Sequence, residues 1–358
     1  MAVSALKSSK LNRRVYDGDE IITVAACFPT TVAPIIQNNL VPVFVDVELS
    51  TYNIDINQIE EAITDKTKGI FIAHTLGNPF NLEKITEIAE KYNLWLIEDN
   101  CDSLSSKYND KLTGTYGHIS TYSFYPAHHI TMGEGGAIST DDNTLYSILL
   151  SLRDWGRDCY CKPGHDNTCG MRFNRKFGTL PFGYDHKYIY SHFGYDLKIT
   201  DWQAAIGLAQ LEKLDKFTQK RKKNFKLLIN GLKKFSRYLI LPTHEENADP
   251  SWFGFILTLK ENNKYDLIDL LRFLEENKIG TRQLFAGNIL RQPLFADSHY
   301  KIKIGKNEFY CDELKEKDMV SLKNTEIISK NTFWIGLWPK IGDEEINRII
   351  STFEKFFI

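Results

Sequence analysis

The stretch LEKITEIAEKYNLWLIED (82–99) joins a segment with apolar residues at helical spacing to a continuously apolar segment that ends in two carboxylates. The same alternation extends in both directions. The other apolar runs are IITVAACF (21–28), VPVFVDV (41–47), GIFIAHT (69–75), STYSFY (120–125) and GAISTD (136–141), with helical patterns at 30–39 and 57–64. Such runs are typical of strands buried on both faces. The alternation therefore predicts an α/β fold with a mostly parallel sheet wrapped by helices.

The composition is that of an ordinary globular protein, and the length of 358 residues suggests about two structural units. The 44 Lys and Arg residues nearly balance the 46 Asp and Glu residues, so the net charge of −2 favours neither nucleic acid nor an anionic membrane as a partner. No apolar run reaches the roughly 18 residues of a membrane helix, and the first residues lack the pattern of a signal peptide. We therefore expect a cytoplasmic protein with a small-molecule partner and reduced cysteines.

The periodic pattern stops between residues 155 and 195, where Gly, Asp, Cys, Tyr and His accumulate. A loop of this length inside a domain is usually functional. The pattern then predicts a long, broken helix over residues 199–235, with Thr200 or Asp201 as its N-cap.

A second structural unit follows this helix. A strand is predicted at 252–259, and helices are predicted at 266–278 and 344–357. We therefore predict two domains: a large one of residues 1–215, which contains the 155–195 loop, and one of residues 216–358, which holds the long helix and a small α+β unit.

Parallel sheets bind ligands at the carboxyl ends of their strands. That rule directs attention to His74 and Thr75, to Glu98 through Asp102, and to Ser123 through Gly136. Taken alone, Asp99 could equally cap a helix or lie in a solvated loop, and the turn GEGG (133–136) is common between strands.

Several motifs occur together in a fixed order: the strand-terminal pair Glu98-Asp99, then a Ser-Phe-x-x-x-basic segment (123–128) followed by GEGGA, then GYDLKITDWQAAIGLAQLEKL (194–214). This combination resembles the DegT/StrS family of sugar aminotransferases. The resemblance implies the aspartate-aminotransferase fold, with a large cofactor-binding domain and pyridoxal phosphate. It also implies that Asp99 pairs with the pyridine nitrogen and that Ser123 holds the phosphate. Asp102 and Tyr125 would be further cofactor-site residues, although either could be a packing or capping residue.

His128 stands where the aminotransferases have the lysine that binds the cofactor covalently. Imidazole cannot form that bond, but it can take and return a proton near neutral pH. Alternation along the chain would point the neighbouring His129 away, so we assign the catalytic base to His128. The loss of lysine resembles the 3-dehydratases of nucleotide-linked 4-keto-6-deoxy sugars, which use pyridoxamine phosphate. An inactive relative is the alternative.

The spacing Cys101-x57-Cys159-x-Cys161-x7-Cys169 resembles the iron–sulfur pattern of dehydratases that act on CDP-4-dehydro-6-deoxyglucose in lipopolysaccharide dideoxyhexose biosynthesis. That resemblance implies a [2Fe–2S] cluster and a reductase partner with flavin and its own iron–sulfur centre. Structural zinc and unconnected thiols are the alternatives. We expect Cys27 and Cys311 to be non-ligands.

Two departures from the family remain. The chain begins in what resembles the tail of the first family helix, so the Gly-Ser-rich loop that cradles the phosphate is expected to be missing. Asp196 replaces an Asn that reaches the partner's phosphate in the family's homodimers. We therefore keep two further hypotheses: a cluster-free nucleotide-sugar 3-dehydratase, and a truncated homologue that acts as a binding subunit.

Overall fold

The computed structural model describes residues 1–162, 164–165, 167–261 and 264–358. Its main feature is an eight-stranded sheet in the order β14-β13-β2-β1-β3-β4-β7-β8. All neighbours pair in parallel except the two edge strands, β14 and β8, which are antiparallel. The strands are β1 (Glu20–Val24), β2 (Val41–Val45), β3 (Thr67–Ala73), β4 (Trp95–Asp99), β7 (Ile119–Ser123), β8 (Gly136–Ser139), β13 (Lys301–Ile304) and β14 (Asn307–Tyr310). The α/β prediction is confirmed, including the six strands predicted before residue 142.

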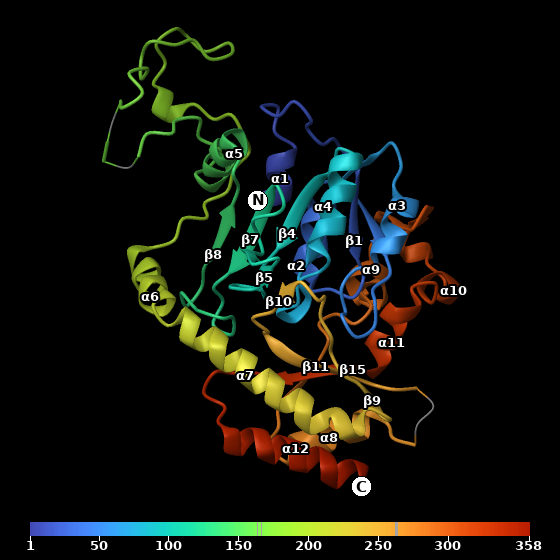
Figure 1. Cartoon of the computed structure of the whole chain (residues 1–358). Helices are drawn as coiled ribbons and strands as arrows, with labels where there is room; N and C mark the ends of the chain where they lie inside the picture. Colours follow the sequence, from blue (N-terminus) through green and yellow to red (C-terminus); the bar gives the residue numbers. More distant parts are fainter. Residues whose placement is uncertain (163, 166, 262–263) are drawn as a thin grey trace.

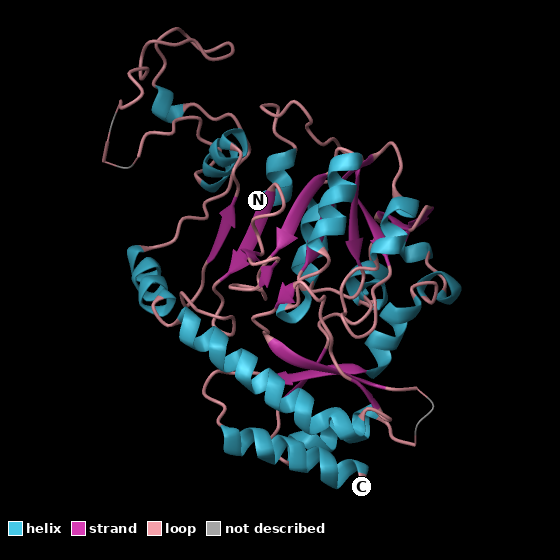
Figure 2. Cartoon of the chain, in the orientation of Figure 1, coloured by secondary structure: helices cyan, strands magenta, loops and turns pink. Residues whose placement is uncertain are grey.

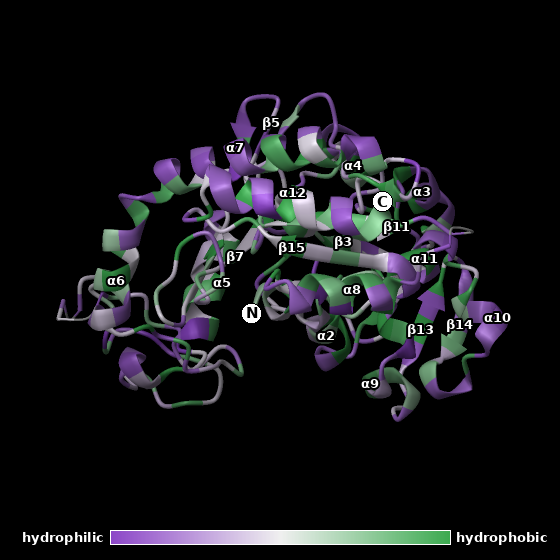
Figure 3. Cartoon of the chain, turned by 90° about the horizontal axis from the view of Figure 1, so that it is seen from below, coloured by the Kyte–Doolittle hydropathy of each residue, from purple (hydrophilic) through white to green (hydrophobic). Residues whose placement is uncertain are grey.

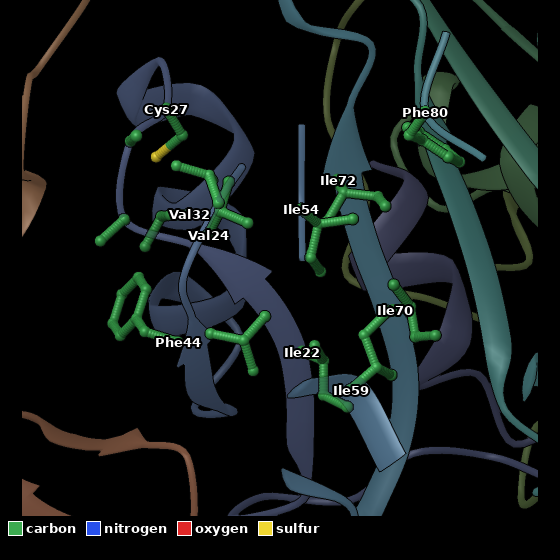
Figure 4. Packing of buried hydrophobic residues seen from close by; sticks show 14 of the residues in the cluster. Ile22, Val24, Cys27, Val32, Phe44, Ile54, Ile59, Ile70, Ile72 and Phe80 are labelled. Carbon is green, nitrogen blue, oxygen red and sulfur yellow. The ribbon is translucent and has the colours of Figure 1, made fainter. Parts of the chain in front are cut away.

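Helices cover both faces of this sheet because its strands are apolar on both sides (Figure 2). Ile70 and Ile72 of β3 belong to the hydrophobic cluster on one face, and Phe71 belongs to the cluster on the other. Figure 4 shows the first cluster, in which Ile22 and Val24 of β1 pack beside β3. The helices of this part are α1 (Ala2–Leu6), α2 (Pro29–Gln37), α3 (Ile59–Ala62), α4 (Leu82–Lys91) and α5 (Asn143–Arg153).

A second, four-stranded antiparallel sheet has the order β12-β15-β11-β9 and its own hydrophobic core. Helix α7 packs against α12, and both alternate hydrophilic and hydrophobic residues along their length (Figure 3). The strands are β9 (Leu239–Ile240), β11 (Gly254–Leu259), β12 (Thr281–Gln283) and β15 (Thr332–Gly336). Helices α7 (Leu214–Leu232), α8 (Leu267–Glu276) and α12 (Asp343–Phe357) contribute to this core. The same part of the sequence contains α9 (Pro293–Ala296), α10 (Glu316–Met319) and α11 (Lys323–Asn331), and Phe295 of α9 and Ile328 of α11 belong to the hydrophobic cluster of the large sheet.

The two predicted domains are interleaved in the structure. Strands β13 and β14 come from the 216–358 part of the sequence, yet they extend the large sheet. A buried ion pair fixes this attachment, because Lys303 of β13 donates to Glu20 of β1 at 2.8 Å. The three-stranded sheet β10-β5-β6 also joins the two parts, through β5 (Lys107–Tyr108), β6 (Lys111–Leu112) and β10 (Ala248–Asp249). Sequence order does not specify such long-range pairing.

The 155–195 segment is a loop, as predicted. Within its described residues it contains only the 3-10 turn η3 (His186–Tyr188) and single bridges as regular structure. It leaves the end of α5 and projects from the sheet at the β8 edge (Figure 1). The helix predicted over 199–235 is broken, with α6 (Asp201–Leu211) before α7, and Thr200 caps α6 together with Gln203. Among the described helices, none has the length and apolar character needed to cross a bilayer.

Candidate active site

Asp99 is the last residue of β4, and its carboxylate is 8% exposed at the carboxyl edge of the sheet. It accepts a hydrogen bond from the Thr31 hydroxyl at 2.8 Å and another from the backbone N–H of Cys101 at 3.2 Å. Thr31 lies in the first turn of α2, which follows β1 after a short connection; β3 separates β1 from β4 in the sheet. These two donors fix the orientation of the carboxylate at the end of β4.

Glu98 and His74 form a buried pair beneath this edge. The Glu98 carboxylate contacts His74 Nε2 at 3.1 Å and accepts hydrogen bonds from the backbone N–H groups of Gly114, Tyr116 and Gly117. Burial by itself would raise the pKa of Glu98, but the hydrogen bond from His74 and those from the backbone hold it below its usual value. The pair fixes the loop after β4 to the end of β3.

His128 lies on the turn between β7 and β8, and its Nδ1 is 2.7 Å from the carbonyl oxygen of Cys101. Because a carbonyl only accepts, Nδ1 carries the proton and Nε2 is left as the basic nitrogen. The ring stacks on Phe253 with centroids 5.2 Å apart. Burial lowers the pKa of His128, so the imidazole is neutral at physiological pH and able to accept a proton.

Asp102 lies below His128, with its Oδ1 3.5 Å from His128 Nδ1. Burial, followed by the nearby charge of Asp99, raises the pKa of Asp102 to about 8. Arg221 of α7 acts in the opposite direction. At neutral pH Asp102 is therefore largely protonated and does not compete, as a charged acceptor, for the Nδ1 proton of His128. That proton stays in the hydrogen bond to the Cys101 carbonyl.

A cavity of about 440 Å³ opens beside His128, between the 126–131 turn, α7 and the end of β15. Arg221, Phe253 and Trp334 line it. Within the described part of the chain, Arg221 Nε, Trp334 Nε1 and His129 Nδ1 are buried polar atoms without a hydrogen-bond partner, and all three residues line this cavity. Unpaired buried polar atoms are costly, and a bound ligand with acceptor oxygens would satisfy the two donors among them, Arg221 Nε and Trp334 Nε1.

The other predicted site residues lie nearby. Ser123 ends β7, and its Oγ accepts from the backbone N–H of Tyr125 at 3.3 Å. Tyr125 is half exposed and meets His128 edge to face. His129 is buried, and its Nε2 is bonded to Ser251 at 2.9 Å, although the residue also lines the cavity. Sequence reasoning missed Thr31, Arg221 and Trp334. Arg221 lies in the run KRKK (220–223), which reads as a solvated helix face.

The model of the DegT/DnrJ/EryC1/StrS aminotransferase family matches residues 2–354. The chain belongs to this family. Among its relatives, lipopolysaccharide biosynthesis protein RfbH of Salmonella typhimurium is 55% identical over 358 residues, which are 100% of this chain and 78% of that protein. The dTDP-4-dehydro-2,6-dideoxy-D-glucose 3-dehydratase of Saccharopolyspora spinosa is 48% identical over 357 residues, 99% of this chain and 74% of that protein.

Solved structures of GDP-4-keto-6-deoxymannose-3-dehydratase share the fold. A mutant with bound GDP-perosamine has a TM-score of 0.83 at 30% identity and covers 98% of this chain and 84% of its own. The E. coli enzyme with bound hydrated PLP has a TM-score of 0.82 at 30% identity, and the match covers 98% of this chain and 83% of that enzyme's chain. The aspartate-aminotransferase-like fold is therefore confirmed, and close members of the DegT/DnrJ/EryC1/StrS family are nucleotide-sugar 3-dehydratases.

The residues of this family member fit a pyridoxal-type cofactor at the carboxyl edge. Asp99 offers an acceptor-only group to a protonated ring nitrogen, and the cavity beside His128 holds unpaired donors. Position 128 has no primary amine, so it is compatible with a cofactor held without a covalent bond.

The four cysteines assigned to a cluster do not meet within one chain. On the loop, Cys161 lies within hydrogen-bonding reach of Cys159 and Cys169. Cys101 lies at the carboxyl edge instead, beside Asp99 and Thr121. The described residues contain no group of three or more His, Cys, Asp or Glu side chains arranged to hold a metal. A single chain in this conformation therefore does not fit a four-thiolate cluster. Cys27 and Cys311 are buried elsewhere.

Proposed function

We propose that this protein is a pyridoxamine-phosphate-dependent 3-dehydratase of CDP-4-dehydro-6-deoxyglucose in the formation of lipopolysaccharide dideoxyhexoses, acting in the cytoplasm. The observation that carries the proposal is His128: a neutral imidazole whose tautomer is fixed by the Cys101 carbonyl lies at the carboxyl edge, in the segment that resembles the one where the family's aminotransferases have their lysine. The 55% identity to a lipopolysaccharide biosynthesis protein and the 48% identity to a nucleotide-sugar 3-dehydratase support it.

The bound cofactor would supply an amine that condenses with the sugar ketone and a ring that accepts electrons. Asp99 would hold the ring nitrogen in its protonated form, and Ser123 would donate to the phosphate. Nε2 of His128 would accept a proton at the reacting carbon and would return it to the departing hydroxyl at sugar carbon 3. Cys101 O keeps the Nδ1 proton in place throughout, so that only Nε2 exchanges protons.

The cavity is where the sugar would lie. Its wall is mostly apolar, which excludes water from the reacting carbon, and Arg221 brings a cation to one side. Burial lowers the pKa of Arg221 to about 10, so it stays charged at neutral pH. Asp102 and Tyr125, which approach His128 from two sides, would limit how the ring turns.

Three finer features belong to this proposal. Cys101, Cys159, Cys161 and Cys169 would ligate a [2Fe–2S] cluster, supported by the clustering of the last three thiols. A flavin and iron–sulfur reductase would deliver electrons to it. The protein would be a homodimer, supported by α6, none of whose residues is buried although it is rich in apolar side chains.

The decisive experiment is hydrogen exchange at the methylene of pyridoxamine phosphate in deuterated buffer, followed by NMR with and without the substrate. We expect exchange that depends on CDP-4-dehydro-6-deoxyglucose and that is faster than with the dTDP- or GDP-linked analogues. Absence of substrate-dependent exchange with all three sugars would falsify the dehydratase. Faster exchange with another nucleotide would revise only the substrate.

A cluster-free 3-dehydratase is the second candidate, favoured by the separation of Cys101 from the loop cysteines. Iron and sulfide analysis of anaerobically reconstituted protein distinguishes the two. About two irons per chain support the cluster, whereas full methylene exchange in protein without iron supports the second candidate.

A further inference from the structure

The cavity beside His128 carries positive charge and no carboxylate. Arg221 and Lys340 line it, and none of the described residues that line it is Asp or Glu. Arg221 is 3% exposed, whereas Lys340 is exposed. Among the ion pairs of the described residues, with a limit of 4.0 Å, none involves either cation. A buried cation without a counter-ion is costly, so this cavity is suited to an anionic group.

Arg221 is held so that one edge of its guanidinium group has no protein partner. Its Nη1 donates to the carbonyl oxygens of Phe253 at 3.0 Å and of Trp252 and Leu337 at 3.5 Å. No hydrogen bond among the described residues uses Nε or Nη2, and Nε is buried. These two nitrogens form the edge of an arginine that binds a carboxylate or a phosphate through two parallel bonds.

Other arginines of the chain show what this edge binds. Nε and Nη2 of Arg153 donate to the two carboxylate oxygens of Asp154 at 2.8 and 3.2 Å. Arg291 uses the same two nitrogens on Glu326, at 2.7 and 2.8 Å. Arg221 has this edge in the wall of a cavity instead of against a carboxylate. The edge is therefore suited to oxygen atoms that a ligand supplies.

A second donor comes to the same cavity from β15. Trp334 Nε1 is buried without a hydrogen-bond partner, and the indole lies on Phe253 with ring centroids 5.5 Å apart. Gly254 allows this position, because a Cβ there would be only 2.6 Å from Trp334 Cε3. Arg221 Cζ is 5.9 Å from the centroid of the same Phe253 ring. The two donors thus belong to side chains that lie beside one ring of the cavity wall.

We propose that the Nε–Nη2 edge of Arg221 and Nε1 of Trp334 bind the diphosphate of the nucleotide sugar, with Lys340 as an outer cation. The inference rests on the proposed function, in which only the substrate diphosphate and the cofactor phosphate carry oxyanions. The cofactor phosphate is assigned to Ser123, which is not among the described residues that line this cavity. His128 does line it, so a sugar joined to a diphosphate at Arg221 lies on the side of the base.

Calorimetry with nucleoside diphosphates tests the site without catalysis. CDP, dTDP and GDP are each compared with their nucleosides on the parent and on Arg221→Lys, which keeps the charge but loses the two-nitrogen edge. The parent should bind its preferred diphosphate more tightly than the nucleoside. Arg221→Lys should weaken diphosphate binding roughly 10- to 100-fold, because hydrogen bonds to charged groups contribute about that much. The affinities for the nucleoside and for pyridoxamine phosphate should not change.

Trp334→Phe is the second variant, because it leaves the bonds of Arg221 to the backbone in place. It removes one neutral donor and should weaken diphosphate binding roughly 3- to 10-fold. Arg272→Lys, at an exposed position of α8, is the matched control and should leave every affinity as in the parent. Circular dichroism checks that each variant is folded.

Several results would overturn the site. Equal losses of affinity for diphosphate, nucleoside and pyridoxamine phosphate would show that Arg221 only supports the fold. A loss for pyridoxamine phosphate as large as that for the diphosphate would assign the donors to the cofactor. Unchanged diphosphate binding in both variants, or a parent that binds diphosphate no better than nucleoside, would exclude an oxyanion here. Methylene exchange tests the dehydratase separately, because it can persist when this site fails and can be absent when diphosphate binds.

Discussion

The carboxyl edge around Asp99 and the 155–195 loop both carry residues assigned to chemistry, but they are built in opposite ways. At the edge, a buried carboxylate, backbone N–H groups and a histidine hold one another at fixed distances. On the loop, the thiols contact mainly one another, and aromatic side chains such as Phe182 and Tyr188 face outward. The difference shows that hydrogen bonds within one chain hold the edge in a single arrangement, whereas the loop has few such contacts with the rest of the chain.

A substitution of His128 gives the strongest test of the contrast between the carboxyl edge and the 155–195 loop. His128→Asn should slow substrate-dependent methylene exchange by roughly 10²–10⁴-fold, because general acid–base catalysis contributes about that much. The Asn amide can still donate to the Cys101 carbonyl in place of Nδ1, so binding of the nucleotide sugar, measured by calorimetry, should persist. His129→Asn is the matched comparison, because His129 is buried against Ser251. If His129→Asn abolishes exchange and His128→Asn does not, the base is the neighbouring histidine.

Glu98→Ala should lower the free energy of unfolding by about 3–5 kcal/mol, because it leaves His74 and three backbone N–H groups without their buried partner. Urea denaturation measures the change. Glu90→Ala, on the exposed face of α4, should stay within about 0.5 kcal/mol of the parent. Equal effects of the two substitutions would show that the edge is not held by this pair.

The raised pKa of Asp102 makes stability at the edge depend on pH. Between about pH 4 and 8 the folded protein keeps this carboxyl protonated while the unfolded chain ionises it, so Asp102 destabilises the fold increasingly as the pH rises. The free energy of unfolding of Asp102→Asn, relative to the parent, should therefore increase by at most about 1.4 kcal/mol per pH unit over this range and level off above pH 8.

Chemical denaturation at a series of pH values measures this difference. Asp141→Asn, at an exposed position, should follow the parent at every pH. A constant difference between Asp102→Asn and the parent would mean that Asp102 is ionised throughout.

The smallest expected effect contrasts the two regions through cysteine. In metal-free protein, Cys161→Ala should change the free energy of unfolding by less than about 0.5 kcal/mol, because its thiol contacts only residues of the same irregular loop, Cys159, Thr168 and Cys169. Cys101→Ala should cost about 1 kcal/mol, because its thiol packs beside Asp99 and Thr121 at the edge. Thermal unfolding of both variants without iron provides the comparison. A larger loss of stability for Cys161→Ala than for Cys101→Ala would show that the loop contributes more to the folded state than the edge at these positions.

The sequence by itself determined the strand and helix alternation, the break between α6 and α7, and the irregular loop. Apolar runs such as LWLIED (94–99) have one stable environment, a sheet covered on both faces, so their pattern suffices. Local capping can also be predicted from sequence, because Thr200 and Gln203 form the N-terminal cap of α6 from positions only three residues apart. The motif order likewise directed attention to Asp99 and His128 before any geometry was available.

Only the tertiary structure decided what depends on residues far apart in the chain. Lys303 reaches Glu20 and carries β13 into the large sheet, although 283 positions separate the pair. Arg221 reaches the cavity from a lysine-rich helix, and its unpaired Nε becomes visible only when its neighbours are placed. The separation of Cys101 from the loop cysteines is of the same kind. Spacing along a sequence records the order of ligands but not their distances, because the intervening fold sets where each side chain lies.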